Sequence, residues 1–242
     1  HEVVVETPDH NAHMGEYPPE HLSDILRMYR DRANDLHRDQ RFRYIQIFKN
    51  YGGSTGASLA HPHSQIMALP ITPRWVKEEL VRAKQHFQLK ERCIFCDIIG
   101  QEVRSGERVV CQNDMFLSFS PFAAKFPFET WILPKDHACE FRYITDQQIP
   151  ALSEVLGRTL RAIKAALNDP PFNVMFHSAP RISPERYPQW TVSVEQDYHW
   201  HIEIIPRTTQ IAGFEWGTGF YINPTLPEKA AAFLRGILAS GD

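Results

Sequence analysis

The stretch 58–66, SLAHPHSQI, places nitrogen-bearing polar side chains at every second position: His61, His63 and Gln65. Alternation with a period of two is the pattern of a β-strand, so these three side chains are expected on one face of that strand. A buried strand face cannot carry two histidines without partners, and a solvent-facing strand does not usually prefer histidine. The stretch therefore predicts a strand that binds a ligand or a metal, or that takes part in a reaction.

The composition is that of an ordinary folded protein. The chain has 242 residues, 43% hydrophobic and 23% charged, with a formal net charge of −3. This balance gives no electrostatic basis for binding nucleic acid, and no apolar run is long enough for a membrane span. No signal peptide is expected. Four cysteines, two of them in a Cys-x-x-Cys motif, are typical of a reducing compartment, so we expect a cytoplasmic protein.

One pattern of elements occurs twice along the chain. In each copy, a strand that ends in Asp-His precedes a helix, a second strand and a strand with alternating histidines. In the first copy these elements are expected at residues 2–10, 18–37, 42–50 and 58–66, and in the second at 129–137, 145–168, 172–180 and 198–206. A further helix over 73–92 would connect the two copies.

We therefore predict an α+β fold that is duplicated in one chain, with copies at 1–85 and 86–242. Each copy would contribute antiparallel strands and one crossover helix, and the two would pair into one larger sheet. In the second copy a Cys-x-x-Cys motif precedes His137 by about 40 residues. The matching motif for His10 would lie upstream of residue 1, so we expect the N-terminal copy to be incomplete.

The second copy holds a ligand set suited to a structural zinc ion: Cys93, Cys96, His137 and His199. Thiolate and imidazole are the ligands that zinc prefers, and four protein ligands close its coordination shell. The alternative for the two cysteines is a redox pair, but no thioredoxin-like βαβ pattern follows them.

Two further metal hypotheses follow. By the repeat, His10 and His61 would be two ligands of a first zinc site that is completed by cysteines upstream. A rival set, for iron or zinc, consists of Glu79, His177, His199 and His201. This set and the cysteine set both contain His199, so the two sets as listed cannot both bind a metal at the same time.

His63 is then left for chemistry, beside the glycine-rich loop 50–58, NYGGSTGAS. Alone, such a loop is more often a plain turn, but next to His63 its backbone N–H groups favour phosphate binding. An imidazole aimed at phosphorus is a competent nucleophile that forms a phosphoramidate. Gln65 cannot protonate a leaving group, but it can donate a hydrogen bond to a phosphoryl oxygen. A leaving group that needs no proton, such as a phosphate, suits this pair.

The segment 50–65, NYGGSTGASLAHPHSQ, resembles the active-site segment of galactose-1-phosphate uridylyltransferases, within the histidine-triad superfamily. The resemblance covers nearly the whole chain. It implies a duplicated histidine-triad-like fold, structural zinc and a homodimer, with ping-pong nucleotidyl transfer through His63. It also implies that Glu215 contacts the hexose. The contacts to the nucleotide phosphates would come from Asn50, Gly56, Ser58 and Gln65.

In the leading hypothesis, His63 takes UMP from UDP-glucose and passes it to the sugar 1-phosphate, galactose 1-phosphate. Two positions depart from the commonest pattern: Ser64 stands where many of these enzymes have glycine, and Tyr221 where a sugar-binding glutamine is frequent. The motif His-Ser-Gln is similar to the ADP-glucose phosphorylase branch, in which the histidine passes AMP to phosphate. A third hypothesis is a zinc-stabilised nucleotide-binding protein without turnover, against which the intact His63 and Gln65 speak.

Overall fold

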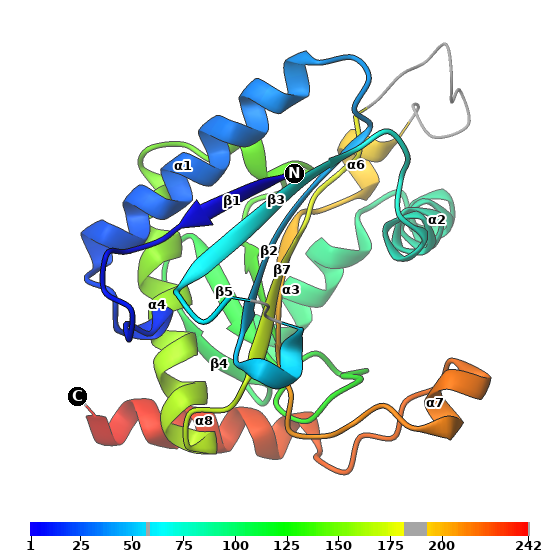
Figure 1. Cartoon of the computed structure of the whole chain (residues 1–242). Coiled ribbons are helices and arrows are strands. Elements are labelled where there is room, and N and C mark those ends of the chain that lie inside the picture. Colours follow the sequence, from blue (N-terminus) through cyan, green and yellow to red (C-terminus); the bar gives the residue numbers. More distant parts are fainter. Residues whose placement is uncertain (57–58, 182–192, 242) are drawn as a thin grey trace.

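The computed structural model describes residues 1–56, 59–181 and 193–241. Over these residues the chain forms one antiparallel sheet of eight strands, in the order β1-β3-β2-β7-β8-β6-β5-β4 (Figure 1). The strands are β1 (Glu2–Val5), β2 (Tyr44–Tyr51), β3 (His63–Leu69), β4 (Val109–Gln112), β5 (Phe116–Phe119), β6 (Thr130–Pro134), β7 (Phe172–His177) and β8 (His201–Pro206). The helices are α1 (Pro19–Arg38), α2 (Arg74–Lys90), α3 (Ile94–Ser105), α4 (Gln148–Leu167), α6 (Val194–Asp197), α7 (Gly213–Thr218) and α8 (Pro227–Gly241), with 3-10 turns η1 (Met14–Glu16), η2 (Gly53–Thr55) and η3 (Phe141–Tyr143).

The sheet is built from a repeated unit. Counted outward from the central β2–β7 pair, the strands run β2, β3, β1 on one side and β7, β8, β6 on the other. Helix α1 connects β1 to β2, and α4 connects β6 to β7 in the same way. The predicted duplicated α+β fold with crossover helices is thus confirmed. The boundary proposed between residues 85 and 86 falls within α2, and that division stays a prediction.

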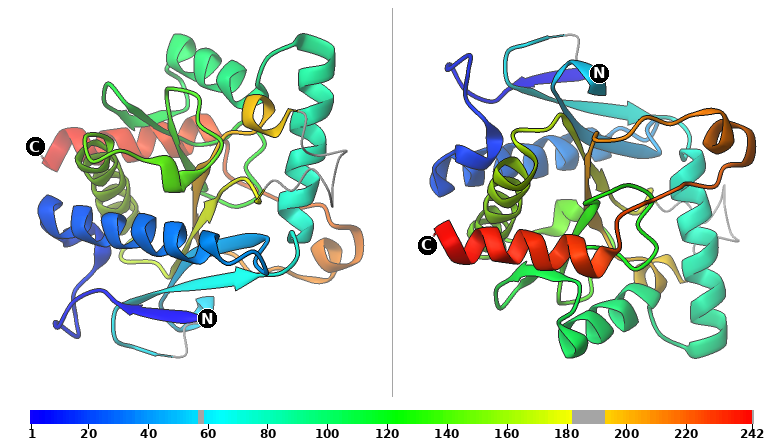
Figure 2. Two further views of the ribbon diagram at one scale, coloured as in Figure 1. Left: turned by 90° about the horizontal axis from the view of Figure 1, so that it is seen from above. Right: turned by 90° about the horizontal axis from the view of Figure 1, so that it is seen from below.

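Helices cover both faces of the sheet (Figure 2). On one face, α1, α4 and α8 enclose a core with the inward residues of the strands, among them Ile47, Val174 and Ile204. On the other face, α2 and α3 pack with residues of β2, β4, β5 and β6, among them Tyr44, Leu117 and Leu133. Apolar residues at helical spacing explain the packing of α1, since Leu22 and Leu26 are buried on one stripe.

The strand that carries the histidine motif is shorter than the sequence pattern predicted. β3 begins at His63, and His61 lies before it. Pro62 stands between the two histidines and has no N–H to donate to a strand ladder. Its carbonyl instead accepts the main-chain N–H of Glu6, at 3.1 Å. As a result His61 and His63 have different surroundings rather than one shared strand face.

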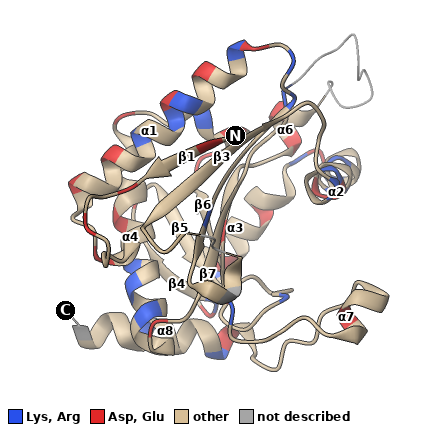
Figure 3. Cartoon of the chain, in the orientation of Figure 1, with Lys and Arg blue, Asp and Glu red and all other residues tan. Residues whose placement is uncertain are grey.

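The predicted connecting helix is confirmed as α2. Strands β4 and β5 and helices α3, α6, α7 and α8 had no counterpart in the prediction. Helix α1 carries both acidic and basic side chains along its length (Figure 3). In the described part of the chain, no helix is both long and apolar enough to cross a membrane.

Candidate functional site

His63 lies at the first residue of β3, where its side chain is 4% exposed. Its Nδ1 atom donates a hydrogen bond to the main-chain oxygen of His61, at 2.8 Å. A carbonyl oxygen can only accept, so this contact places the proton on Nδ1. The Nε2 atom of the neutral ring therefore carries the lone pair that a nucleophile needs.

A cavity of about 490 Å³ opens beside His63. It is lined by residues from the segment after β1, from the end of β2, from the glycine-rich loop and from the segment before β3. The lining residues are His10, Asn11, Ala12, Lys49, Asn50, Tyr51, Gly52, Gly53, Leu59, Ala60, His61, Pro62 and His63. The structure therefore brings His63, Asn50 and the glycine-rich loop together.

The glycine-rich loop depends on glycine at its two turning points. Gly52 has φ +83° and Gly56 has φ +84°, and the two flank the η2 turn. A β-carbon at Gly52 would come within 2.9 Å of the Pro171 side chain, so a larger residue is excluded by both conformation and space. Ser58, also predicted to contact phosphate, lies outside the described residues.

Asn173, from the second copy, is a site residue that sequence reasoning missed. It pairs with Asn50 across the β2–β7 junction, and its Nδ2 donates to Asn50 Oδ1 at 2.7 Å. Because that oxygen accepts, the amide of Asn50 is oriented with its donor Nδ2 on the other side. The signal in the sequence is weak, since it requires knowledge that β2 and β7 are neighbours.

Two predicted site residues in the described part of the chain do not line the cavity. Gln65 is on β3, two residues after His63, and its Oε1 accepts a hydrogen bond from His1 Nε2 at 2.9 Å. Glu215 is on α7, which projects away from β3 (Figure 1), and its Oε2 accepts the main-chain N–H of Ala212 at 3.0 Å. Neither residue is among those described that line the cavity.

His10 and His61 face each other, with their Nδ1 atoms 3.1 Å apart. The Nε2 atom of His61 donates to the main-chain oxygen of Thr7 at 2.7 Å, which leaves its Nδ1 deprotonated in the neutral ring. A deprotonated imidazole nitrogen is the form that binds a metal. His10 Nδ1 therefore donates the hydrogen bond between the two rings, and loss of its proton would leave two converging metal ligands at the edge of the cavity.

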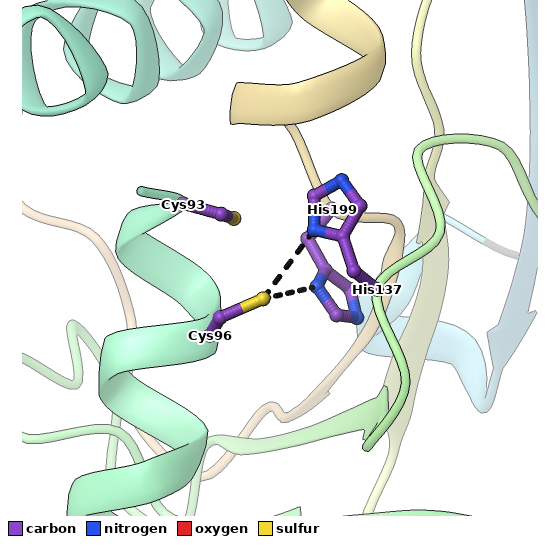
Figure 4. A group of neighbouring side chains, drawn as sticks. All are labelled: Cys93, Cys96, His137 and His199. Carbon is purple, nitrogen blue, oxygen red and sulfur yellow. Dashed lines mark hydrogen bonds between the residues drawn. The ribbon is translucent and has the colours of Figure 1, made fainter. Parts of the chain in front are cut away.

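Cys93, Cys96, His137 and His199 form a compact group whose ligand atoms all lie within 4.8 Å of one another (Figure 4). The Sγ atom of Cys96 is 3.3 Å from His137 Nδ1 and 3.7 Å from His199 Nδ1. The cysteines come from the start of α3, and the histidines from the loops that follow β6 and precede β8. The four residues predicted as a zinc set are therefore assembled.

Hydrogen bonds to this group fit a zinc ion. His137 Nε2 donates to the Glu195 carbonyl at 3.0 Å, and His199 Nε2 donates to the Pro134 carbonyl at 2.9 Å. Both rings thus turn a deprotonated Nδ1 toward the sulfurs, as the outer hydrogen bonds of metal-binding histidines do. The pKa of the Cys96 thiol is lowered, chiefly because it is hydrogen-bonded by the Cys93 thiol.

A second metal-competent group consists of Glu79, His177, His201 and Glu203. This corrects the rival set predicted from the sequence, because His199 belongs to the cysteine group and Glu203 takes its place. His199 Nε2 is hydrogen-bonded to the Pro134 carbonyl, whereas the His201 ring stacks on His177, with ring centroids 4.7 Å apart. The two groups share no residue, so both can be filled at once.

The second group is buried and strongly polarised. Burial lowers the pKa of His177, but Glu79 and Glu203 outweigh it and raise that pKa to about 9. Burial, with the charge of His177, lowers the pKa of His201 to about 3. Among the described residues, His201 Nε2 has no hydrogen-bond partner, while its Nδ1 donates to the His199 carbonyl at 3.1 Å. Its lone pair therefore lies on Nε2 and faces the carboxylates, an arrangement that fits a cation.

The chain is similar to known proteins along most of its length. The model of a domain family of unknown function, DUF4921, matches residues 4–236. The chain is 39% identical to the ADP-glucose phosphorylase of Arabidopsis thaliana over 98% of its own length and 64% of that protein. It is 32% identical to the galactose-1-phosphate uridylyltransferase of Thermotoga maritima, over 97% of the chain and 73% of that protein. The chain thus spans less than two thirds of the plant relative.

Similarity extends to solved structures. The crystal structure of the Arabidopsis thaliana ADP-glucose phosphorylase with bound ADP-glucose superposes with a TM-score of 0.87 at 39% identity. The superposition covers 96% of this chain and 72% of that one.

Proposed function

Because the chain belongs to the DUF4921 family and to the galactose-1-phosphate uridylyltransferase family, within the histidine-triad superfamily, we propose that it transfers a nucleotidyl group through His63. The observation that carries the proposal is the hydrogen bond from His63 Nδ1 to the His61 carbonyl, at 2.8 Å. It leaves Nε2 as the nucleophile, at the wall of a cavity large enough for a nucleotide phosphate and its sugar.

In the first step, Nε2 attacks the α-phosphorus of a nucleoside diphosphate sugar. The P–N bond forms, the bond to the bridging oxygen breaks, and the sugar 1-phosphate leaves with that bond's electron pair and no proton. The phosphorylated ring is then an imidazolium, whose Nδ1–H remains hydrogen-bonded to the His61 carbonyl. In the second step an acceptor phosphate oxygen attacks the same phosphorus and the P–N electrons return to Nε2, which restores the neutral ring.

The remaining site residues would bind the phosphates. The glycine-rich loop offers backbone N–H groups, and Asn50 offers the amide donor that Asn173 orients. Gln65 lies two residues after His63 on the same strand. It would stabilise phosphoryl charge with its amide nitrogen, because its amide oxygen already accepts a hydrogen bond from His1. Gly56 and Ser58 would complete the loop.

Two donor and acceptor pairs are candidates. The ADP-glucose and phosphate pair is favoured by the 39% identity to a plant ADP-glucose phosphorylase and by Ser64 in the motif. The UDP-glucose and galactose 1-phosphate pair is favoured by the family of the Thermotoga maritima relative. In both pairs the chemistry at His63 is the same, and the base and the acceptor differ.

The metals would be structural. A zinc ion bound by Cys93, Cys96, His137 and His199 would fix α3 against the loops beside β6 and β8. His10 and His61 would supply two ligands of another zinc site. The second group, with its carboxylates and imidazoles, suits iron or zinc.

The assembly is proposed to be a homodimer. Glu215 lies on α7, outside the cavity of its own chain, so a role in binding a hexose requires the site of a second copy. Phe214, Trp216 and Phe220 on and after α7 are at least half exposed, as expected for a segment that contacts another chain. The free cysteines favour a reducing, cytoplasmic setting.

The first test is the covalent intermediate itself. The protein is incubated without acceptor, with ADP-glucose and separately with UDP-glucose, and its intact mass is measured. We expect an AMP or UMP adduct on His63 that the matching acceptor discharges. If neither sugar nucleotide labels a folded, zinc-loaded protein, nucleotidyl transfer is wrong and a binding protein without turnover is favoured.

A further inference from the structure

A buried network of polar side chains lies next to the nucleophile, and one of its members, Lys49, is also among the residues that line the cavity. At its centre is the carboxylate of Glu6, whose side chain has no exposed surface. Lys49 donates to Glu6 Oε2 at 2.8 Å, and Tyr17 donates to the same oxygen at 3.0 Å. Ser64 donates to Glu6 Oε1. None of these residues takes part in the chemistry proposed above.

The protons of this network run in one direction. A carboxylate can only accept, so the single hydroxyl proton of Ser64 is used toward Glu6. The hydroxyl of Ser64 must then accept from Tyr29, with which it is also in hydrogen-bond contact. Every group is thus satisfied when Glu6 is ionised and Lys49 is protonated, which is the condition for a stable buried pair.

Lys49 links this network to the nucleophile. Its Nζ atom also donates to the main-chain oxygen of His63, at 3.2 Å, and its side chain is 3% exposed. The His63 carbonyl therefore takes its position from an ion pair buried under α1. Because Lys49 and Glu6 come from different segments, the pair ties β2 and the residue after β1 to the start of β3.

The network is centred on the segments that frame the cavity. Glu6 also donates its main-chain N–H to the Pro62 carbonyl at 3.1 Å, within the motif His61-Pro62-His63. A shift of about 1 Å in a reacting group can lower a rate by about 100-fold. The main-chain path of the motif is therefore held at two successive carbonyls, those of Pro62 and His63, by Glu6 and its partner lysine.

We propose that Lys49 is a positioning residue for the His63 nucleophile, acting with Glu6 and Ser64 through the main chain of the motif. The inference rests on the proposed function for its kinetic readout, but it also predicts a property of the protein without substrate. Lys49 holds the carbonyl of His63 so that the ring remains on the cavity wall, with Nδ1 toward the His61 oxygen.

The test compares Lys49→Met with Lys49→Arg, and with Lys164→Met as a control. Lys164 is another ion-paired lysine, 2.6 Å from Glu16, on the more exposed surface of α4. We expect Lys49→Met to slow single-turnover nucleotidylation of His63 by about 10–100-fold, with the dissociation constant for the sugar nucleotide changed less than about threefold. Lys49→Arg should recover part of the rate, and Lys164→Met should react like the wild type.

Lys49→Met leaves Glu6 buried without its cation, so it can fail to fold. The double variant Glu6→Gln/Lys49→Met removes both charges and keeps the shapes, which restores stability in many buried pairs. We expect this folded double variant to remain slow, because the contact to the His63 carbonyl is still missing. A double variant as fast as the wild type would overturn the proposal.

Hydrogen exchange of the peptide over 59–66 gives a readout without substrate. We expect faster exchange in the double variant than in Lys164→Met, and unchanged exchange would overturn the positioning role even if the rate fell. If the wild type forms no adduct with either sugar nucleotide, the proposed function fails, and the exchange result alone decides whether Lys49 organises this segment.

Discussion

His63 and His201 make the same hydrogen bond in the two halves of the sheet. His63 Nδ1 donates to the carbonyl of His61 at 2.8 Å, and His201 Nδ1 donates to the carbonyl of His199 at 3.1 Å. The preceding histidines match as well, since both use Nε2 to donate to a main-chain oxygen. What differs is the space in front of Nε2. His63 faces a cavity, whereas His201 faces the carboxylate of Glu203 and is fully buried.

Replacement of the nucleophile should separate chemistry from structure. His63→Ala should abolish the nucleotidyl adduct, with zinc content and melting temperature close to those of the wild type, because the side chain of His63 has no role in the metal groups. Intact mass, elemental analysis and thermal unfolding check this. The partner variant His61→Ala should disturb the His10 pair instead. Loss of zinc in His63→Ala would mean that the roles of the two histidines are exchanged.

Replacement of a zinc ligand should act in the opposite order. In Cys93→Ser we expect loss of one zinc equivalent first, with a destabilisation of about 3 kcal/mol or more, which corresponds to roughly 6–12 °C in melting temperature. Activity should fall only as the fold is lost. Cys111→Ser is the matched control, because Cys111 is a buried cysteine outside both metal groups. Unchanged zinc content in Cys93→Ser would contradict the assignment.

Because the two metal groups share no residue, their ions should be lost independently. Glu79→Gln should remove the metal of the second group and leave the zinc bound by Cys93 and Cys96. Cys93→Ser should do the reverse, and the double variant should lose both. Metal content after reconstitution with zinc, and separately with iron, measures this. A wild-type protein that never holds metal in both groups at once would show that they exclude each other after all.

The orientation of Asn50 should depend on Asn173. Asn173→Leu removes the donor to Asn50 Oδ1, and we expect the sugar nucleotide to bind roughly 3–10-fold more weakly, the size of one hydrogen bond. Asn173→Asp should weaken binding further, because a carboxylate attracts the Nδ2 of Asn50 and adds a negative charge near the phosphates. Titration calorimetry gives the affinities. Asn34→Leu, which removes a hydrogen bond to the Arg142 carbonyl, is the control and should bind normally.

His37 should contribute to a loss of stability in mild acid. Burial, with the charges of Arg142 and Arg181, lowers the pKa of His37 to about 4. Between that value and its ordinary pKa of about 6.5, the unfolded chain binds a proton that the folded protein does not, so stability falls as the pH falls. For a half-buried group the effect is about 1–2 kcal/mol. Between pH 7 and pH 4, denaturant unfolding should show a smaller loss in the free energy of unfolding for His37→Asn than for the wild type. The same dependence of that free energy on pH in both proteins would refute this.

The sequence predicted the elements whose patterns are local. The repeat of Asp-His strands, helices and histidine strands predicted both α1 and α4. Because His10 and His137 occupy matching places in the two copies, the repeat also indicated both as candidate metal ligands. The motif His61-Pro62-His63 by itself indicates the candidate nucleophile. These inferences depend on spacing within a few residues, or on comparison of the two copies, in which a residue of one identifies the equivalent residue of the other.

The parts that sequence reasoning missed depend on contacts between distant residues. In the run 199–203 three polar side chains alternate, and spacing alone cannot show that the Pro134 carbonyl holds His199 apart from His201. Asn173 enters the site because β7 lies beside β2. The network of Glu6, Lys49 and Ser64 joins residues up to 58 positions apart, and each of them by itself has an ordinary sequence context.

The central position of the β2–β7 pair has a consequence for how the chain is made. Tyr51 pairs with Phe172, so during synthesis one edge of β2 stays open while roughly 120 further residues are translated, for about 6–24 s at ordinary elongation rates. An open strand edge can pair with another chain. The nascent protein therefore passes through a long interval in which the β2 edge can pair with other chains and aggregate. The final yield in the cell should depend on what covers the β2 edge during that interval.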